Sequence, residues 1–289
     1  MSGLVLKEKV AVITGGNRGI GFAIANKLAA EGCSLALIAR SQNELEASAD
    51  EIKKSWKASV MTLPIDISNE QQVQKAISST REAFGKIDIL INGAGMIGPI
   101  GPLSEIKSDE WQRTLDTNLN GTFYCIKAVL PEMLKRRFGR ILNFSGGGAL
   151  LPNPFIDAYS VSKAAIVRLT ENLSLELKQT GVTVCAISPG AINTKMFEET
   201  LAGGKNKLPK EIWDLLEARK KTGGDSIEAA ASLALFLVSG SNAEVVNGRV
   251  ISAKYDEWHR HTEHAKEIGT TDIFTMRRIV PRDRGFDWQ

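Results

Sequence analysis

The sequence predicts an α/β protein built on one doubly wound parallel sheet of about seven strands, with helices on both faces. Short runs of β-branched and aliphatic residues recur, each nearly continuous in apolar character, as a strand covered on both faces requires. Helical stretches long enough to act as crossovers separate these runs, and a glycine-rich turn follows the first. The expected strands are Val10 to Thr14, Ser34 to Ala39, Val60 to Leu63, Ile87 to Ile91, Arg140 to Phe144, Val182 to Ile187 and Val250 to Ser252.

Length and composition fit one soluble globular domain. The chain has 289 residues, of which 43% are hydrophobic and 24% are charged. A net charge of +3 is too small to indicate nucleic acid, and the basic clusters at Lys135 to Arg137 and Arg277 to Arg284 are typical of a helix end and a tail. Met1 to Val10 has no apolar signal core, and no apolar run reaches about 18 residues. We expect a cytoplasmic protein with no nucleic-acid and no membrane partner.

The three cysteines, Cys33, Cys125 and Cys185, lie far apart and form no Cys-x-x-Cys pair. Their number and spacing favour neither a disulfide framework nor a zinc site. Two of them, Cys33 and Cys185, fall in apolar runs, so we expect buried, unreactive thiols there.

The first expected strand runs into a glycine-rich turn that precedes a helix-like stretch, Phe22 to Glu31. Such a turn lets the backbone approach a pyrophosphate, while the helix N-terminus offers free N–H groups and a positive dipole end. The alternative is an ordinary tight turn with a helix cap. We favour dinucleotide binding and assign to it Thr14, Gly15, Asn17, Arg18, Gly19, Ile20 and Gly21.

The second expected strand ends in Arg40 and Ser41, with no carboxylate until Glu44. A carboxylate here would hold a ribose 2′-hydroxyl and repel a 2′-phosphate, whereas an arginine pairs with phosphate through two N–H groups. We therefore predict NADP as cofactor, with NADPH preferred over NADH. Arg40 is the main expected phosphate ligand and Arg18 or Ser41 assists. The alternative is that Arg40 is merely solvated.

The next two expected strands end in further candidate cofactor residues. Asp66, with Ile67 beside it, is expected to accept the adenine amino hydrogen; the alternative is a helix cap, although Ser68 with Gln71 already makes a plausible capping box. The fourth strand ends in a turn that exposes backbone where the adenosine ribose is expected, formed by Asn92, Gly93, Ala94 and Gly95.

The stretch around the fifth expected strand carries the candidate chemistry. The strand delivers Ser145 to its carboxyl end, and two prolines then exclude helix until about Ile156. Tyr159 and Lys163 follow four residues apart, on one helix face. Moving a phenol pKa from about 10 to about 7 takes roughly 4 kcal/mol, and a unit charge roughly 4 Å away supplies on the order of 4 kcal/mol before desolvation. The alternative is an ordinary pair on a solvated helix.

Taken in order, the glycine loop, the Asn92 turn, Asn118, Ser145 and Tyr159-xxx-Lys163 resemble the short-chain dehydrogenase/reductase family in its compact form, marked by Thr-Gly-xxx-Gly-x-Gly. The resemblance covers roughly Lys9 to Ser252. It implies a single Rossmann-type domain, usually a homodimer or homotetramer packed through the long helices after strands four and five. It also implies that Tyr159 exchanges a proton with the substrate oxygen and that Lys163 lowers the phenol pKa and hydrogen-bonds the nicotinamide ribose.

Further roles follow from the same resemblance. Ser145 is expected to orient and polarise the carbonyl, and Asn118 to hold a water that links the lysine to solvent. The loop after strand six is expected to hold the nicotinamide carboxamide through Pro189, Gly190, Ile192 and Thr194.

We divide the chain into a catalytic domain, residues 1–253, and a C-terminal extension, residues 254–289. Residues 195–224 are expected to form a substrate lid with glycine pairs at its edges, Gly203-Gly204 and Gly223-Gly224; the alternative is one more surface helix. The extension departs from the family pattern, and we expect it to pack on the body or a neighbouring subunit. It holds all three histidines, for which we expect a solvated amphipathic helix and no metal.

These expectations combine into an NADPH-dependent oxidoreductase acting on a small, moderately hydrophobic ketone or alcohol. Two alternatives stay open. One is an epimerase or dehydratase that uses the cofactor transiently, and the other is a cofactor-binding sensor without turnover.

Overall fold

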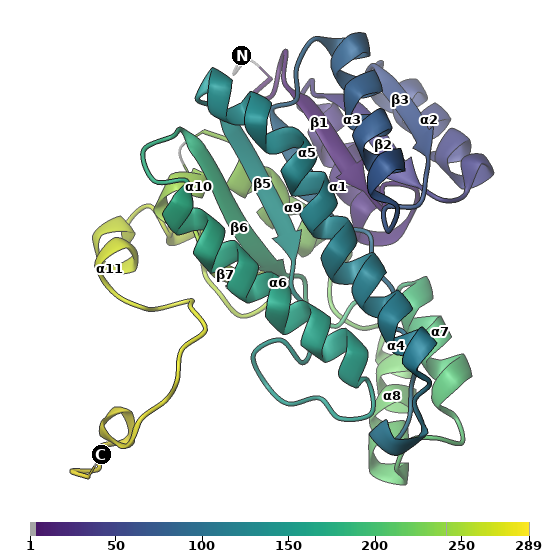
Figure 1. The fold of residues 1–289 in the computed structure, drawn as a ribbon, viewed down its shortest axis with the longest axis vertical. Helices are drawn as coiled ribbons and strands as arrows, with labels where there is room; N and C mark the ends of the chain where they lie inside the picture. The colour runs from purple at the N-terminus through teal and green to yellow at the C-terminus, as the bar shows by residue number, and fades with distance from the viewer. Residues whose placement is uncertain (1–3, 241, 289) are drawn as a thin grey trace.

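The computed structural model describes residues 4–240 and 242–288, so residues 1–3 at the start of the expected catalytic domain lie outside the described part. One parallel sheet of seven strands runs in the order β3-β2-β1-β4-β5-β6-β7 (Figure 1). The order reverses between β1 and β4, which creates the ligand crevice at the carboxyl ends of these strands. The doubly wound α/β fold is thus confirmed. The strands are β1 Val10–Thr14, β2 Ser34–Ala39, β3 Val60–Pro64, β4 Ile89–Asn92, β5 Gly139–Phe144, β6 Val182–Ser188 and β7 Val250–Ser252.

Helices connect the strands and cover both faces of the sheet (Figure 1). The α-helices are α1 Gly19–Ala30, α2 Gln42–Trp56, α3 Glu70–Phe84, α4 Ser108–Leu115, α5 Gly121–Arg136, α6 Asp157–Glu176, α7 Lys195–Gly204, α8 Lys210–Thr222, α9 Ile227–Val238, α10 Asn242–Val245 and α11 Ala265–Thr270. A π-helical turn, η2 Asp116–Asn120, joins α4 to α5, and short 3₁₀ turns are η1 Leu103–Glu105, η3 Trp258–Arg260 and η4 Pro281–Arg284. None of the described helices is long and apolar enough to span a membrane.

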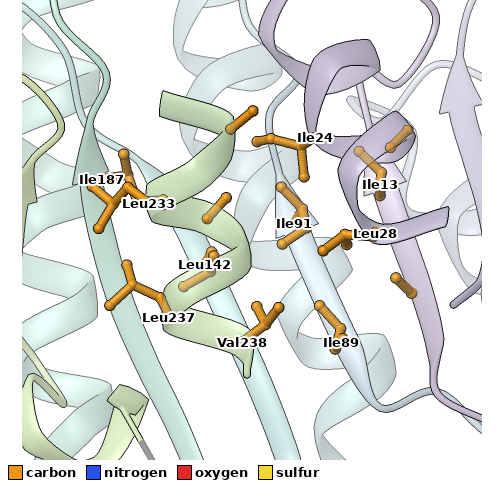
Figure 2. Packing of buried hydrophobic residues seen from close by; sticks show 14 of the residues in the cluster. Ile13, Ile24, Leu28, Ile89, Ile91, Leu142, Ile187, Leu233, Leu237 and Val238 are labelled. Atoms are coloured by element: carbon orange, nitrogen blue, oxygen red, sulfur yellow. The ribbon is translucent and has the colours of Figure 1, made fainter. Parts of the chain in front are cut away.

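Two hydrophobic clusters hold the layers together. On one face, α1 and α9 pack side by side over the sheet through side chains such as Ile24, Leu28 and Leu233, which meet Ile13 and Ile91 of the strands (Figure 2). On the other face, α3, α5 and α6 cover the alternate strand residues. Because β1, β2, β4, β5 and β6 each contribute to both clusters, their sequences are apolar without alternation, the pattern expected of a parallel sheet.

The helix after β3 begins later than the sequence suggested. Asn69 is the N-cap, and its side-chain oxygen accepts the Gln72 N–H at 3.0 Å. Ser68 instead donates its hydroxyl to Asp66 at 2.8 Å. The expected capping box of Ser68 with Gln71 is therefore wrong, because the asparagine oxygen already satisfies the free N–H of the first turn.

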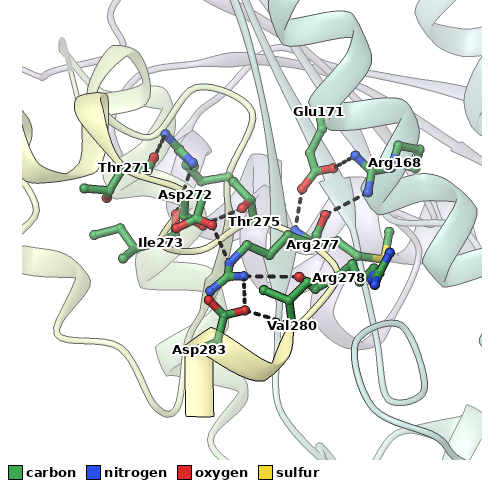
Figure 3. Close-up of polar contacts among 12 residues, drawn as sticks. Arg168, Glu171, Thr271, Asp272, Ile273, Thr275, Arg277, Arg278, Val280 and Asp283 are labelled. Carbon is green, nitrogen blue, oxygen red and sulfur yellow. Dashed lines mark hydrogen bonds and ion pairs between the residues drawn. The ribbon is translucent and has the colours of Figure 1, made fainter. Parts of the chain in front are cut away.

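The segment after β7 returns to the body of the protein. The Val250 N–H donates to the Phe274 carbonyl at 2.9 Å, so residues of this segment lie along the edge strand β7. Arg168 and Glu171 of α6 then bind the two backbone groups of Met276, at 2.7 and 2.6 Å (Figure 3). These contacts fix the segment on β7 and α6 up to about residue 276.

His261 lies inside this segment and not in a solvated helix as expected. Its side chain is 5% exposed and its ring lies 5.2 Å from that of Phe274, centroid to centroid. Burial is the main cause of its lowered pKa, with the charges of His264 and His259 adding to it. Among the described residues, no group of three or more His, Cys, Asp or Glu side chains could hold a metal ion.

All three cysteines are free and buried. Burial raises the pKa of each thiol to about 12. The prediction of buried thiols in the apolar runs is confirmed, and Cys125 belongs with them.

Candidate active site

Helix α6 brings Tyr159 and Lys163 to the carboxyl end of β5. The Lys163 ammonium lies 5.7 Å from the centre of the Tyr159 ring and donates a hydrogen bond to the Phe144 carbonyl at 2.8 Å. A Cβ at Gly146 would collide with the Tyr159 hydroxyl, so only glycine leaves room for the phenol against the end of the strand. Ser145, 3% exposed, immediately precedes this glycine. The serine, phenol and ammonium expected from the sequence are therefore gathered at one strand end.

The electrostatics of this group differ from the expectation. Burial raises the pKa of Tyr159 to about 12 and lowers the pKa of Lys163 to about 8. The expected lowering of the phenol pKa by the lysine is wrong for this arrangement, because burial disfavours the charged form of both groups. At neutral pH the phenol keeps its proton, which is the form able to donate to a carbonyl oxygen.

Asn118 lies in the π-helical turn η2. Its side chain is 0% exposed, accepts the Met96 N–H at 2.8 Å and donates to the Met96 carbonyl at 2.9 Å. A Cβ on Gly95 would lie 3.2 Å from the Asn118 oxygen and 3.8 Å from the Lys163 nitrogen, so amide and ammonium border the same spot. Such turns often mark functional sites because the extra residue redirects a side chain.

Ser162 is a positioning residue that the sequence reasoning missed. Its hydroxyl accepts from Asn118 at 3.0 Å and donates to the Tyr159 carbonyl at 2.7 Å. This joins the π-helical turn to the first turns of α6. The available signal was a small polar residue directly before Lys163, which by itself is common in helices.

The loop after β1 forms a backbone cradle. Gly15 has φ +69°, and a Cβ there would lie 3.0 Å from Ala94. Thr14 joins this loop to the loop after β4, because its hydroxyl accepts the Ala94 N–H at 3.1 Å. Arg18 is the N-cap of α1 and makes no side-chain capping bond, so the first N–H groups of the helix, at Gly19, Ile20 and Gly21, are available to an anion. These features fit a dinucleotide pyrophosphate.

The side chain of Asn92 does not face this cradle. The side chain is 3% exposed and donates to Asn143 at 2.9 Å inside the sheet. Only its backbone and the following Gly93 and Ala94 can face a ligand.

A group of charges gathers beside the cradle, at the end of β2. Arg40 is exposed there, and Ser41 caps α2 by accepting the Glu44 N–H at 3.4 Å. The Glu44 carboxylate pairs with Arg18 at 3.3 Å, lies 3.9 Å from Lys195 and accepts a hydrogen bond from Asn17. Arg18, one of the two arginines expected to bind phosphate, is thus paired with a carboxylate that was not among the expected site residues.

Asp66 and Ile67, the two residues expected near the adenine, also stabilise the local structure. One oxygen of Asp66 accepts the Ser68 N–H at 2.9 Å and the Ser68 hydroxyl at 2.8 Å. Ile67 is 5% exposed and packs against Gly121 at the start of α5. Its side chain belongs to the core, which leaves its backbone to face a ligand.

A cavity of about 420 Å³ lies next to Tyr159. One wall is the loop after β6, with Pro189, Gly190, Ile192 and Thr194, and Ile20 of the cradle adjoins it. Helices α7 and α8, with Leu208 between them, supply a mainly apolar cover that also includes Met196, Phe197, Ile212 and Leu216. Tyr255, just beyond β7, also lines the cavity.

The two glycine pairs of the expected lid differ in conformation. Gly203 and Gly204 are the last residues of α7, and a Cβ on Gly204 would lie 2.7 Å from Leu208. Gly204 thus allows close packing against Leu208. Gly223 and Gly224, with φ +92° and +72°, do form a sharp turn after α8.

Comparison with known proteins places the chain among oxidoreductases. Residues 9–204 match the family model of short chain dehydrogenase. Uncharacterized oxidoreductases of Staphylococcus saprophyticus and Staphylococcus aureus (strain MW2) are 38% and 34% identical, over 72% of this chain in each case and 88% and 89% of those proteins.

Solved structures agree with the sequence match. NAD+-bound xylitol dehydrogenase superposes with a TM-score of 0.80 at 28% identity, covering 86% of this chain and 98% of that one. Levodione reductase gives 0.79 at 29% identity, covering 92% and 100%.

Proposed function

The chain belongs to the short-chain dehydrogenase family, and from this premise we propose that it is an NADPH-dependent oxidoreductase of a small-molecule ketone or alcohol. The family makes it an oxidoreductase with a nicotinamide cofactor. The observation that carries the proposal is the position of Tyr159, which lines the 420 Å³ cavity together with the loop after β6 and lies against Gly146, the residue that follows Ser145.

Each residue of the site has its own role in the proposed reaction. When bound, the nicotinamide supplies or accepts the hydride. Tyr159, protonated at neutral pH, donates its proton to the carbonyl oxygen, and in the oxidative direction it takes the proton from the alcohol. Ser145 hydrogen-bonds the same oxygen. Lys163 and Asn118 border one spot behind the phenol, where a proton can be returned from solvent.

The preference for NADPH is supported by the cations at the end of β2. Arg18, Arg40 and Lys195 can pair with a 2′-phosphate, and Arg18 and Arg40 can do so through paired N–H groups. The Glu44 carboxylate would repel the phosphate, but the positive charges of Arg18 and Lys195 offset its negative charge.

The substrate is a moderately hydrophobic carbonyl compound or the corresponding alcohol. The apolar side chains of α7 and α8 support this, because they form most of the cavity wall opposite the nicotinamide loop. The protein acts as a homodimer or homotetramer. Exposed apolar side chains on α5 and α6, namely Phe123, Leu134, Val161 and Leu175, support contact with a second copy.

Steady-state kinetics with NADPH and NADH over a panel of ketones and alcohols tests the proposal. Tyr159→Phe should abolish turnover while leaving the Kd of NADPH within about twofold, because the ring still fills the same space. Tyr124→Phe, a tyrosine of α5 outside the cavity, is the matched control and should keep wild-type rates. Substantial turnover by Tyr159→Phe would assign the acid to another group, and equal efficiency with NADH would overturn the cofactor preference.

A further inference from the structure

The loop after β6 is held by side chains that the proposed reaction does not use. Arg219 of α8 donates to the Ile192 carbonyl at 2.7 Å and to the Asn193 side chain at 3.0 Å. Its guanidinium carbon lies 4.0 Å from the centre of the Phe197 ring. One side chain of the cover thus binds the loop backbone and stacks on α7.

Asp225 holds the same loop from its other side. Its carboxylate accepts the Ala191 N–H at 2.6 Å, and its own N–H donates to the Ala191 carbonyl at 2.9 Å. Its second oxygen pairs at 2.9 Å with Lys254, which follows β7 by two residues. Arg219 of α8 and Asp225 of the turn after it therefore bind one short loop, and Lys254 at the start of the C-terminal segment pairs with Asp225.

The fit leaves little freedom in the loop. A Cβ on Gly190 would lie 2.8 Å from the Asp225 carboxylate, and one on Gly224 would lie 2.7 Å from the Ala191 carbonyl. Burial by itself would raise the pKa of Asp225, but hydrogen bonds from Lys254 and Ala191, with the charges of Lys254 and Arg219, hold it below its usual value. The carboxylate is charged at neutral pH, which strengthens its bond to the Ala191 N–H.

We propose that Arg219 and Asp225, with Lys254 behind Asp225, are positioning residues that fix the loop 189–194 where it meets the nicotinamide end of the cofactor. The inference rests on the proposed function, since it needs a bound nicotinamide. Because Arg219 belongs to α8, the same contacts join the cover of the cavity to the loop. Cofactor binding and substrate binding are therefore linked through one guanidinium.

Two ligands separate this role from general stability. NADPH reaches the loop, whereas 2′-phospho-ADP-ribose carries the same adenosine and pyrophosphate without a nicotinamide. Isothermal titration calorimetry of the full chain should show about tenfold weaker NADPH binding by Arg219→Ala, with 2′-phospho-ADP-ribose changed by less than about twofold. Arg219→Lys should recover part of the loss, because an ammonium can reach one of the two acceptors but lacks the planar fork.

The contact that Asp225 and Lys254 make with the loop is tested in the same way. Asp225→Asn and Lys254→Met should each weaken NADPH selectively, by about threefold to tenfold, and raise its KM more than they lower kcat. Lys210→Met is the matched control, because Lys210 lies on α8 and pairs only with the neighbouring Asp214 at 3.1 Å among the contacts of the described chain. It should leave both dissociation constants unchanged.

The outcomes are distinguishable. The positioning role is overturned if the variants weaken the binding of NADPH and of 2′-phospho-ADP-ribose equally. It is also overturned if no variant with the melting temperature of the wild type weakens NADPH binding. Both results leave the proposed function intact. If the wild type prefers NADH, the pair NADH and ADP-ribose carries the same comparison. Failure of the wild type to bind any of these four ligands overturns the proposed function and this inference together. Should Arg219→Ala not fold, Arg219→Lys and Lys254→Met decide by the same criterion.

Discussion

At the scale of single residues, Glu44 stands out because its carboxylate pairs with Arg18 at 3.3 Å beside the expected 2′-phosphate site, closer than Glu199 at 4.0 Å. Glu44→Gln removes a charge that repels phosphate and competes for the arginine. We expect NADPH to bind roughly threefold to tenfold more tightly, with little change for NADH. The measurement is the ratio of the two dissociation constants. Glu46→Gln, two residues further along α2 and exposed, is the control; an unchanged ratio in Glu44→Gln would place the phosphate elsewhere.

A second residue-scale prediction concerns Tyr159 and pH. A raised pKa means that the phenol keeps its proton to higher pH, so it stays an acid through the neutral range and becomes a base only at strongly alkaline pH. The protein has three tyrosines, and the difference in tyrosinate absorbance between the wild type and Tyr159→Phe isolates this one. In the cofactor-free protein the difference should develop only near its pKa of about 12. A midpoint at or below pH about 9 would contradict the dominance of burial.

At the scale of elements, the carboxylate of Asp88 ties three parts of the fold together. Its side chain is 1% exposed, accepts the Val10 N–H at 3.0 Å at the start of β1, and pairs with Arg136 of α5 at 2.8 Å. Arg136→Met leaves this buried charge with Lys86 alone, at 3.5 Å. We expect a loss of about 3 kcal/mol in urea unfolding. Lys135→Met, the exposed neighbour on α5, should cost far less, and similar midpoints for both would show that the pair adds no stability.

The sequence predicted the elements well where pattern alone decides them. Continuous apolar runs identified the strands, and Pro152 with Pro154 located the start of α6. The expected start of β4 at Ile87 was early, because the Asp88 side chain takes the Val10 N–H that a strand carbonyl would otherwise accept. The π-helical turn around Asn118 was missed, since its extra residue is stabilised by contacts with Met96 and Ser162 from other segments.

The residues of the candidate site could likewise be predicted where a local sequence pattern identifies them. Motifs that are local in sequence, such as the glycine loop and the Tyr159 and Lys163 pair, could be assigned from spacing. Contacts between distant segments could not. The pairs of Glu44 with Arg18 and of Asp225 with Lys254 join residues 26 and 29 positions apart along the chain, and surface charges at such separations carry no pattern in the sequence.

At the scale of the whole molecule, the C-terminal arm, residues 277–288, runs away from the sheet and ends clear of the helices (Figure 1). Arg277 orders it by pairing with Asp283 at 2.6 Å (Figure 3). Ile279, Phe286 and Trp288 are nevertheless more than half exposed, at 57%, 55% and 62%. An ordered arm that leaves large apolar side chains in water is typical of a surface covered by another copy.

This arm gives the prediction for assembly. A chain ending at Met276 keeps the backbone contacts to α6 and should fold, but it should form a smaller oligomer than the full chain. Light scattering after size-exclusion chromatography measures the mass. Replacing the three apolar side chains by serine in the full chain should give the same shift, and an unchanged mass in both would show that the arm takes no part in assembly.

The buried cysteines have a practical consequence. With all three thiols inside the core and protonated, alkylating dyes have no native target at neutral pH in the folded protein. A cysteine introduced at Lys210 on α8 would then be the single labelled position without any prior removal of natural ones. Fluorescence from that position would test whether the cavity cover moves when a ligand binds.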